Sequence, residues 1–512
     1  MLELLVLFAL GFVLNLALTP LMREVARKIG LVDKPDGRRK LQTSAIPVAG
    51  GPAVLVSVTV AVFAAFTAAP LLGLTVNFRP DVLLGLLAAA VIICSVGVID
   101  DFVGLRGRYK LLGQCVAVAV VIACGVQIHR INLFGLEMDL GWFSIPLTMF
   151  LLLGAINSLN LLDGMDGLLG SVGLIVCATF GAMALVCGQV AAAWVAFTLA
   201  GALLAFLRYN FPPATIYLGD SGSMLVGLVV GVLAIHGSLK GPATIALIAP
   251  ACVLVVPIFD TAAAITRRKL IGRSIFSTDR GHLHHCLLRS GLSRRMALLV
   301  VSAMCVVGMA GGLLSVTYRS EAAAAIAAVA IVLTLIVTRL FGYNEARLIL
   351  QRLHYLARQT LRFQADAGPE LAVQIQGTIN WRPIWDRVSA EARRLKLRQV
   401  RLDIEAPAIG ESFHARMDRG FNTNSEALRE LKIVFPLEVG GRVIGRLEVL
   451  GDRAAAPLAL IVGEVTELVH EMERIAEELI ATAQSPATPA SATIPSDSPV
   501  VPKPVASVLS ET

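Results

Sequence analysis

The sequence predicts an all-α polytopic membrane protein with a small α/β domain at its C-terminal end. Of the 512 residues, 56% are hydrophobic and only 16% are charged, whereas soluble proteins carry about 25% charged residues. The apolar residues gather in about eleven runs, each close to the ~20 residues that cross a bilayer. The last run ends near residue 341, so the chain beyond it is expected to fold separately.

We assign the membrane part to residues 1–342. Its expected transmembrane helices centre on residues 2–19, 50–68, 82–99, 111–127, 143–160, 168–187, 190–207, 222–237, 243–264, 296–315 and 322–341. The first run lacks the basic start of a signal peptide, because Glu3 stands there and Arg23, Arg27 and Lys28 follow the run. We therefore expect it to be a retained span.

Loops rich in lysine and arginine alternate along the chain with loops that are poor in them, and this pattern predicts the orientation of the protein in the membrane. Most of them lie in the loops 20–47, 100–110, 208–221 and 266–295. The opposite loops contain Arg79, Arg130, Lys240 and Arg319. By the positive-inside rule the N-terminus lies outside and the C-terminus lies in the cytoplasm. The net charge of +7 then reflects contact with anionic lipid, and no basic stretch interleaved with aromatic residues suggests nucleic acid.

Three further segments follow the membrane part. Residues 343–368 form a basic amphipathic helix and linker, which lies either on the inner membrane surface or against a soluble domain. Residues 369–481 read as a cytoplasmic α/β domain with strands at 400–404, 432–439 and 442–450 and a helix at 457–481. Its closing hairpin and helix weakly resemble the end of a GAF-type sensor domain. Residues 482–512 are rich in Ser, Thr, Ala and Pro and are expected to be disordered.

The polar residues of the membrane part gather at predicted cytoplasmic ends of the spans. They are Lys34, Arg38, Asp100, Asp101, Lys110, Asn157, Asn160, Asp163, Asp166, Asp220, Asp260, Arg267, His282, His284 and His285. A charge at the bilayer centre costs about 2.5–3.5 kcal/mol, so these groups should face water or a polar ligand. Carboxylates suit a hard cation, glycine-flanked turns suit phosphates, and basic groups suit anionic oxygens. This combination predicts phosphoryl transfer at the inner membrane face.

Each cluster also has a simpler interpretation. Adjacent aspartates at a span end can be solvated caps, and Asp220 before Ser221 can be a helix N-cap. The histidines of the HLHH segment, residues 282–285, could bind zinc, but no Cys or Glu partner has suitable spacing. A transporter would place such residues near the bilayer midplane between repeats, and the sequence contains no evident repeat.

The motifs together resemble a known family, the polyprenyl-phosphate N-acetylhexosamine-1-phosphate transferases. The matching segments, between about residues 30 and 290, are DKPDGRRK, PVAGG, VIDDF, GRYKLLGQ, NSLNLLDGMDGL, YLGDSGS, PIFDT and HLHH. The HLHH form resembles the branch that makes lipid-linked N-acetylglucosamine for cell-surface polysaccharides. The branch that builds the peptidoglycan precursor typically has three consecutive histidines, and Leu283 interrupts that pattern.

The resemblance implies a reaction and a role for each candidate residue. N-acetylhexosamine 1-phosphate would pass from a UDP-sugar to undecaprenyl phosphate in the bacterial inner membrane, with release of UMP. Asp220 and Asn160 would hold Mg²⁺, with Mn²⁺ as the alternative metal. Asp100 and Asp101 would act at the acceptor phosphate, and Asp163 and Asp166 would support the nucleotide or metal. The substrate-binding residues would be Lys34, Arg38, Lys110, Asn157, Arg267, His282, His284 and His285.

Several alternatives stay open at this stage. The donor could be UDP-MurNAc-pentapeptide, as in the related peptidoglycan branch. A protein of a different class, either a multispanning transporter or a membrane sensor driven by the C-terminal domain, would release no UMP. Direct displacement and a covalent phospho-enzyme are equally compatible with the sequence, and the protein could form a homodimer.

The position of the candidate residues generates a prediction for the C-terminal region. All of them precede residue 286, so residues 343–512 are expected to modulate or localise the protein without contributing to its chemistry. Truncation after Phe341 should leave transfer activity largely intact in a protein that still inserts and remains monodisperse. Complete loss of UMP release in such a protein would contradict this expectation.

Overall fold

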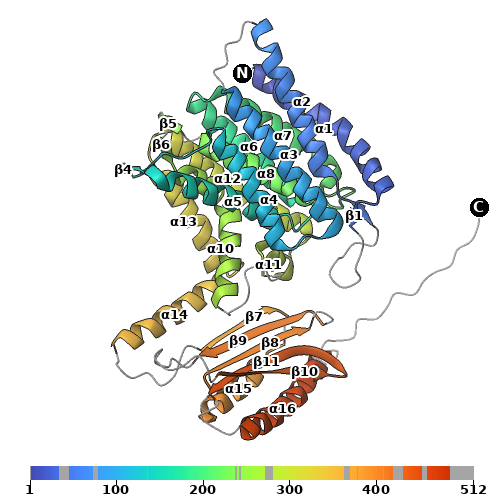
Figure 1. Cartoon of the computed structure of the whole chain (residues 1–512), viewed down its shortest axis with the longest axis vertical. Coiled ribbons are helices and arrows are strands. Elements are labelled where there is room, and N and C mark those ends of the chain that lie inside the picture. The colour runs from blue at the N-terminus through green and yellow to red at the C-terminus, as the bar shows by residue number, and fades with distance from the viewer. Residues whose placement is uncertain are drawn as a thin grey trace, which may run out of the picture.

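The protein consists of a bundle of long helices and a sheet domain at one end of that bundle (Figure 1). The computed structural model describes residues 2–33, 45–72, 79–134, 136–236, 239–241, 244–270, 281–361, 370–377, 379–395, 397–406, 409–418, 430–452 and 458–484.

The bundle contains most of the helices. They are α1 (Leu2–Ile29), α2 (Gly50–Ala68), α3 (Pro80–Val103), α4 (Gly107–Ala123), α5 (Ser144–Leu162), α6 (Leu168–Val186), α7 (Val190–Asn210), α8 (Gly219–His236), α9 (Ile248–Val253), α10 (Val255–Leu270), α11 (Leu283–Arg289), α12 (Arg294–Thr317) and α13 (Ala322–Val337). Two small sheets accompany them, β1 (Val32–Asp33) with β2 (Ile46–Pro47), and β4 (Leu136–Asp139), β3 (Arg130–Leu133), β6 (Thr244–Ala246) and β5 (Leu239–Gly241) in that order.

Within the described ranges, eight helices are long and apolar enough to cross a membrane. They are α1, α2, α3, α5 with its preceding turn, α6, α7, α8 and α12. Two other predicted spans are shorter, because α4 has 17 residues and α13 has 16. The run at 243–264 is interrupted between α9 and α10, where Pro257 removes a backbone N–H donor in the first turn of α10. The protein is thus a multi-pass membrane protein, while the count of eleven and the orientation stay predictions.

Helix α8 lies at the centre of the bundle, with 78% of its residues buried. Glycines allow its neighbours to approach its backbone closely. A Cβ atom added to Gly97 of α3 would lie 2.2 Å from Cα of Ser221, and one added to Gly51 of α2 would lie 2.3 Å from N of Gly222. Such contacts between small residues are typical of helix packing in membranes. They fix the first turn of α8 against the ends of α2 and α3.

The C-terminal domain is a five-stranded antiparallel sheet covered on one face by two helices. Its elements are β7 (Glu370–Gln376), α15 (Arg382–Arg394), β8 (Gln399–Ala406), β9 (Glu411–Asp418), β10 (Glu430–Val439), β11 (Arg442–Asp452) and α16 (Leu458–Gln484), with the strand order β10-β11-β8-β9-β7. The predicted hairpin is confirmed, and its turn residues Gly440 and Gly441 have φ values of 57° and 71°. Most of the predicted tail falls on residues 485–512, which lie outside the described ranges.

Helix α14 (Tyr343–Leu361) connects the two parts (Figure 1). Leu348 is buried against Leu371 and Val373 of β7, with Leu270 of α10 packed beside them. Leu350 and Leu353 on the same helix are exposed. The helix therefore packs on the sheet domain, one of the two arrangements expected from the sequence, while Leu350 and Leu353 leave part of its apolar surface exposed.

The close approach of α3 to α8 generates a prediction. Gly97→Ala places a methyl group against backbone atoms that cannot rotate away, and overpacking of this kind costs about 1–3 kcal/mol. We expect a clear fall in the midpoint of thermal unfolding in detergent. Gly154→Ala on α5 is the matched control, because no atom lies within 4 Å of the added Cβ. Equal stability of the two variants would contradict the packing argument.

Candidate functional site

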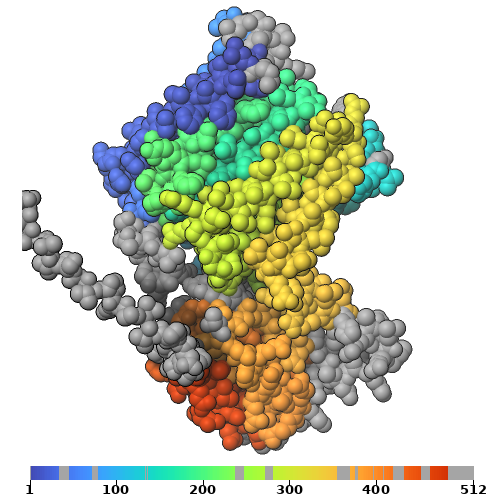
Figure 2. Space-filling view, turned by 180° about the vertical axis from the view of Figure 1, so that it is seen from behind, coloured from blue at the N-terminus to red at the C-terminus, as the bar shows by residue number. Residues whose placement is uncertain are grey.

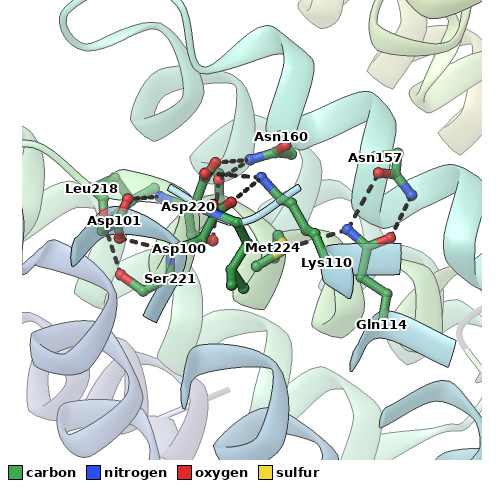
Figure 3. A network of polar contacts seen from close by, with 12 residues as sticks. Asp100, Asp101, Lys110, Gln114, Asn157, Asn160, Leu218, Asp220, Ser221 and Met224 are labelled. Atoms are coloured by element: carbon green, nitrogen blue, oxygen red, sulfur yellow. Dashed lines mark hydrogen bonds and ion pairs between the residues drawn. The ribbon is translucent and has the colours of Figure 1, made fainter. Parts of the chain in front are cut away.

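Four helix ends meet at the side of the bundle that faces the sheet domain (Figure 1). The C-terminal ends of α3 and α5 supply Asp100, Asp101 and Asn160, and the first turns of α4 and α8 supply Lys110 and Asp220. Figure 3 shows these side chains pointing toward one another. The structure therefore brings together candidates that are separated by up to 120 positions in the chain.

Asp101 binds the start of α8 through both of its carboxylate oxygens. Oδ1 accepts a hydrogen bond from the backbone N–H of Asp220 at 2.9 Å, and Oδ2 accepts one from the N–H of Ser221 at 3.2 Å. The first N–H groups of a helix have no partner within the helix, and the positive end of the helix dipole favours an anion. Asp101 thus acts as a cap supplied by another helix and sets the position of Asp220.

Lys110 bridges two carboxylates. Its Nζ lies 3.0 Å from Oδ2 of Asp100 and 2.8 Å from Oδ2 of Asp220. Asn160 donates from Nδ2 to Oδ1 of Asp220 at 2.5 Å and to Oγ of Ser223 at 2.8 Å (Figure 3). One ammonium group and one amide therefore hold the Asp220 carboxylate in a fixed orientation next to Asp100.

Asn157 lies one turn before Asn160 but has a different partner. It exchanges two hydrogen bonds with Gln114 of α4, at 2.8 and 3.2 Å, and its amide also donates to the carbonyl oxygen of Leu153. Gln114 is only 1% exposed. Gln114 and Ser223 end the motifs GRYKLLGQ and YLGDSGS, but neither was among the predicted site residues. The available signal for Gln114 was an amide on the same helical face as Lys110, four residues later in an apolar helix.

Asp163 and Asp166 follow α5 and lie in different surroundings. Burial, together with the negative charges of Asp220, Asp101 and Asp166, raises the pKa of Asp163 to about 8. Asp166 instead accepts a hydrogen bond from the N–H of Ala214 at 3.1 Å. Asp163 therefore belongs electrostatically to the carboxylate cluster, whereas Asp166 fixes the loop between α7 and α8.

The histidine segment, residues 282–285, packs against Asp260 in the N-terminal half of α10. His282 Nδ1 lies 3.0 Å from Oδ2 of Asp260, whose other oxygen accepts the N–H of Leu283 at 2.8 Å. Burial lowers the pKa of His284 to about 3, so this side chain is neutral at pH 7. A Cβ added to Gly164 would lie 2.3 Å from the His284 ring, which places this ring against the loop that contains Asp163.

The remaining basic candidates lie in different surroundings. Arg267 is buried and forms an ion pair with Glu345 of α14, a residue that sequence analysis did not consider. His285 is half-buried, and its ring centroid lies 4.2 Å from that of His284. Lys34 and Arg38 lie outside the described residues.

The chemistry of the cluster is compatible with a divalent cation. In the described part of the chain, no three His, Cys, Asp or Glu side chains lie close enough to form a complete metal site. Mg²⁺, however, is usually held by one or two carboxylates together with substrate phosphates and water. Asp220 beside Asn160 offers such a partial site. The pKa of Asp163 is raised first by burial and then by the neighbouring carboxylates, and a cation would relieve this second contribution.

Comparison with known proteins points to one family. Residues 83–238, which include the whole cluster around Asp220, match the family described as glycosyl transferase family 4. A relative from Bacillus subtilis (strain 168), named probable undecaprenyl-phosphate N-acetylglucosaminyl 1-phosphate transferase, is 33% identical over 305 residues, which cover 59% of this chain and 82% of the relative. The Salmonella typhi undecaprenyl-phosphate alpha-N-acetylglucosaminyl 1-phosphate transferase is 33% identical, with coverage of 55% and 76%. The Mycobacterium tuberculosis (strain CDC 1551 / Oshkosh) decaprenyl-phosphate N-acetylglucosaminephosphotransferase is 34% identical, with coverage of 55% and 74%.

The reciprocal amide pair between α4 and α5 generates a prediction. Gln114→Leu and Asn157→Leu should each lower stability, because each leaves a buried amide with fewer partners. The double variant should lose about 1 kcal/mol less than the sum of the single losses, the usual magnitude for a hydrogen bond between membrane helices. Unfolding of all four proteins in one detergent measures this coupling energy. Strictly additive losses would show that the two amides do not interact.

Proposed function

Because this chain belongs to glycosyl transferase family 4, we propose that it transfers N-acetylglucosamine 1-phosphate from UDP-N-acetylglucosamine to undecaprenyl phosphate and releases UMP. The observation that carries the proposal is the cluster of Asp100, Lys110, Asn160 and Asp220 at one end of the membrane helices. The names of the relatives support a polyprenyl phosphate acceptor and N-acetylglucosamine as the sugar, in preference to UDP-MurNAc-pentapeptide.

The reaction joins two anions, and the cluster suits that task. The acceptor phosphate already carries a negative charge, so its attack requires relief of repulsion more than it requires a strong base. Lys110 offers a positive charge between Asp100 and Asp220. When bound by Asp220 and Asn160, Mg²⁺ would neutralise the donor diphosphate and its leaving group.

The two adjacent aspartates receive different roles in this proposal. Both oxygens of Asp101 accept backbone N–H groups of α8, so Asp101 positions Asp220. Asp100 accepts the N–H of Leu105 at 2.7 Å through one oxygen and faces Lys110 with the other. Asp100 is therefore the better candidate for direct action at the acceptor phosphate.

The donor is proposed to bind between the cluster and the histidine segment. His282 is oriented by Asp260, and neutral His284 lies against the loop of Asp163. Arg267, which lies in the last turn of α10 and pairs with Glu345, would contribute positive charge on this side. The site would face the cytoplasm of the bacterial inner membrane, where the UDP-sugar is available, in agreement with the charge distribution of the loops.

One assay tests the function directly. Purified protein should release UMP from UDP-N-acetylglucosamine only when both undecaprenyl phosphate and Mg²⁺ are present. Asp220→Ala should reduce this release about 10²–10³-fold, the size of effect seen when a key electrostatic group is lost, and should leave the protein folded in detergent. UMP release near the wild-type rate by Asp220→Ala at saturating Mg²⁺ would falsify the assignment of this residue.

Lys110 gives a second test. Lys110→Met leaves Asp100 and Asp220 without their shared cation, so we expect kcat/KM to fall about 10²-fold. Arg106→Met is the control, since it removes an exposed positive charge one turn away on the same side of the bundle. If both substitutions change kcat/KM equally, Lys110 contributes only general positive charge.

A further inference from the structure

The C-terminal extension contributes a charged residue to the membrane part. Glu345, in the first turn of α14, forms an ion pair with Arg267 in the last turn of α10. The two side chains are only 9% and 4% exposed. A buried charge of this kind is stable only when it is paired, so Glu345 helps to hold Arg267 in place.

Arg267 in turn contacts the histidine segment. A Cβ added to Gly281 would lie 2.4 Å from Cζ of Arg267, so the guanidinium group packs directly on the backbone before His282. Two turns earlier on α10, Asp260 accepts hydrogen bonds from His282 and Leu283. Helix α10 therefore contacts this segment at two points, through Asp260 and through Arg267. The position of the Arg267 side chain determines the second contact.

The start of α14 is built into the bundle, so Glu345 does not reach Arg267 by chance. Phe341 packs edge-on against Phe259 of α10, with ring centroids 5.4 Å apart. Gly342 has a φ of 80°, and a Cβ there would lie 2.5 Å from Cζ of Phe259. Only glycine fits this turn, which places the start of α14 against α10. Figure 2 shows the yellow chain of this region passing from the bundle onto the orange sheet domain.

A polar cavity of about 390 Å³ lies beside the ion pair, between the bundle and β7. Arg267, Arg289, Arg339 and Glu345 line it together with residues of β7. Glu345 is the acidic residue of this lining. Its carboxylate pairs with Arg267 within a lining whose other charged residues are basic.

We propose that Glu345 is a positioning residue that orients Arg267 toward the diphosphate of the UDP-sugar. This inference rests on the proposed transfer reaction, and it places a functional residue beyond the expected end of the membrane unit at 342. Truncation after Phe341 removes Glu345. This inference therefore predicts weaker binding of the UDP-sugar by the truncated protein, whereas the sequence alone predicted that its activity stays largely intact.

The test compares Glu345→Gln, Glu345→Asp and a control in the full-length protein. Glu345→Gln keeps the shape but removes the charge, so we expect the KM for UDP-N-acetylglucosamine to rise about tenfold. The KM for undecaprenyl phosphate and kcat should change less than about twofold, and Glu345→Asp should recover part of the loss. Glu477→Gln, which removes an exposed charge from α16 of the same extension, should behave like wild type.

Direct binding separates this inference from the proposed reaction. Titration of wild type and Glu345→Gln with UDP and with uridine should show weaker UDP binding in the variant and equal uridine binding, because only UDP carries the diphosphate. Unchanged UDP binding would overturn the positioning role even if the wild type turns over. Equal weakening of uridine and UDP, or a parallel shift of both KM values, would show a merely structural role and would also overturn it. Absence of UMP release by wild type that binds UDP would instead reject the proposed reaction.

Discussion

The hydrogen bonds from the first turn of α8 to Asp101 are the constraint on which the arrangement of the site depends. They join the end of one membrane helix to the start of another and satisfy N–H groups that would otherwise lack partners at the membrane boundary. Gly97 makes the bonds geometrically possible, because any larger residue would collide with Ser221. This contact sets the position of Asp220, because its backbone N–H is one of the two that Asp101 binds.

The rest of the cluster is arranged around Asp220. Lys110 and Asn160 come from two other helices, and each contacts the Asp220 carboxylate. The result is an acidic group that is oriented but still partly accessible, with 33% of its side chain exposed. A carboxylate in that state can exchange a protein partner for a cation or a phosphate-bound metal, whereas a fully enclosed one could not. This is the physical basis for proposing Asp220 as the metal ligand and Asp101 as the residue that positions it.

The extension beyond the membrane part is attached by more than a linker. Its sheet has an independent core that includes Trp381, Trp385 and Met472, which explains why it reads as a separate domain. Its connecting helix, however, packs on β7 through Leu348 and reaches α10 through Glu345. The sheet domain is therefore joined through α14 to Arg267, whose guanidinium group packs on the backbone before the histidine segment.

The sequence by itself determined the class of the protein, the ends of the spans at which its polar residues gather, and the hairpin and final helix of the C-terminal domain. These features follow from local composition and periodicity, because a bilayer admits only apolar helices of limited length and a Gly-Gly turn favours a hairpin. The tertiary structure alone decided which polar residues meet. It gave Asp101 and Asp100 different partners, paired Asn157 with Gln114 and Arg267 with Glu345, and set Asp166 against the loop between α7 and α8. Such contacts join residues far apart in the chain, and their partners depend on how helices cross, which no local pattern specifies.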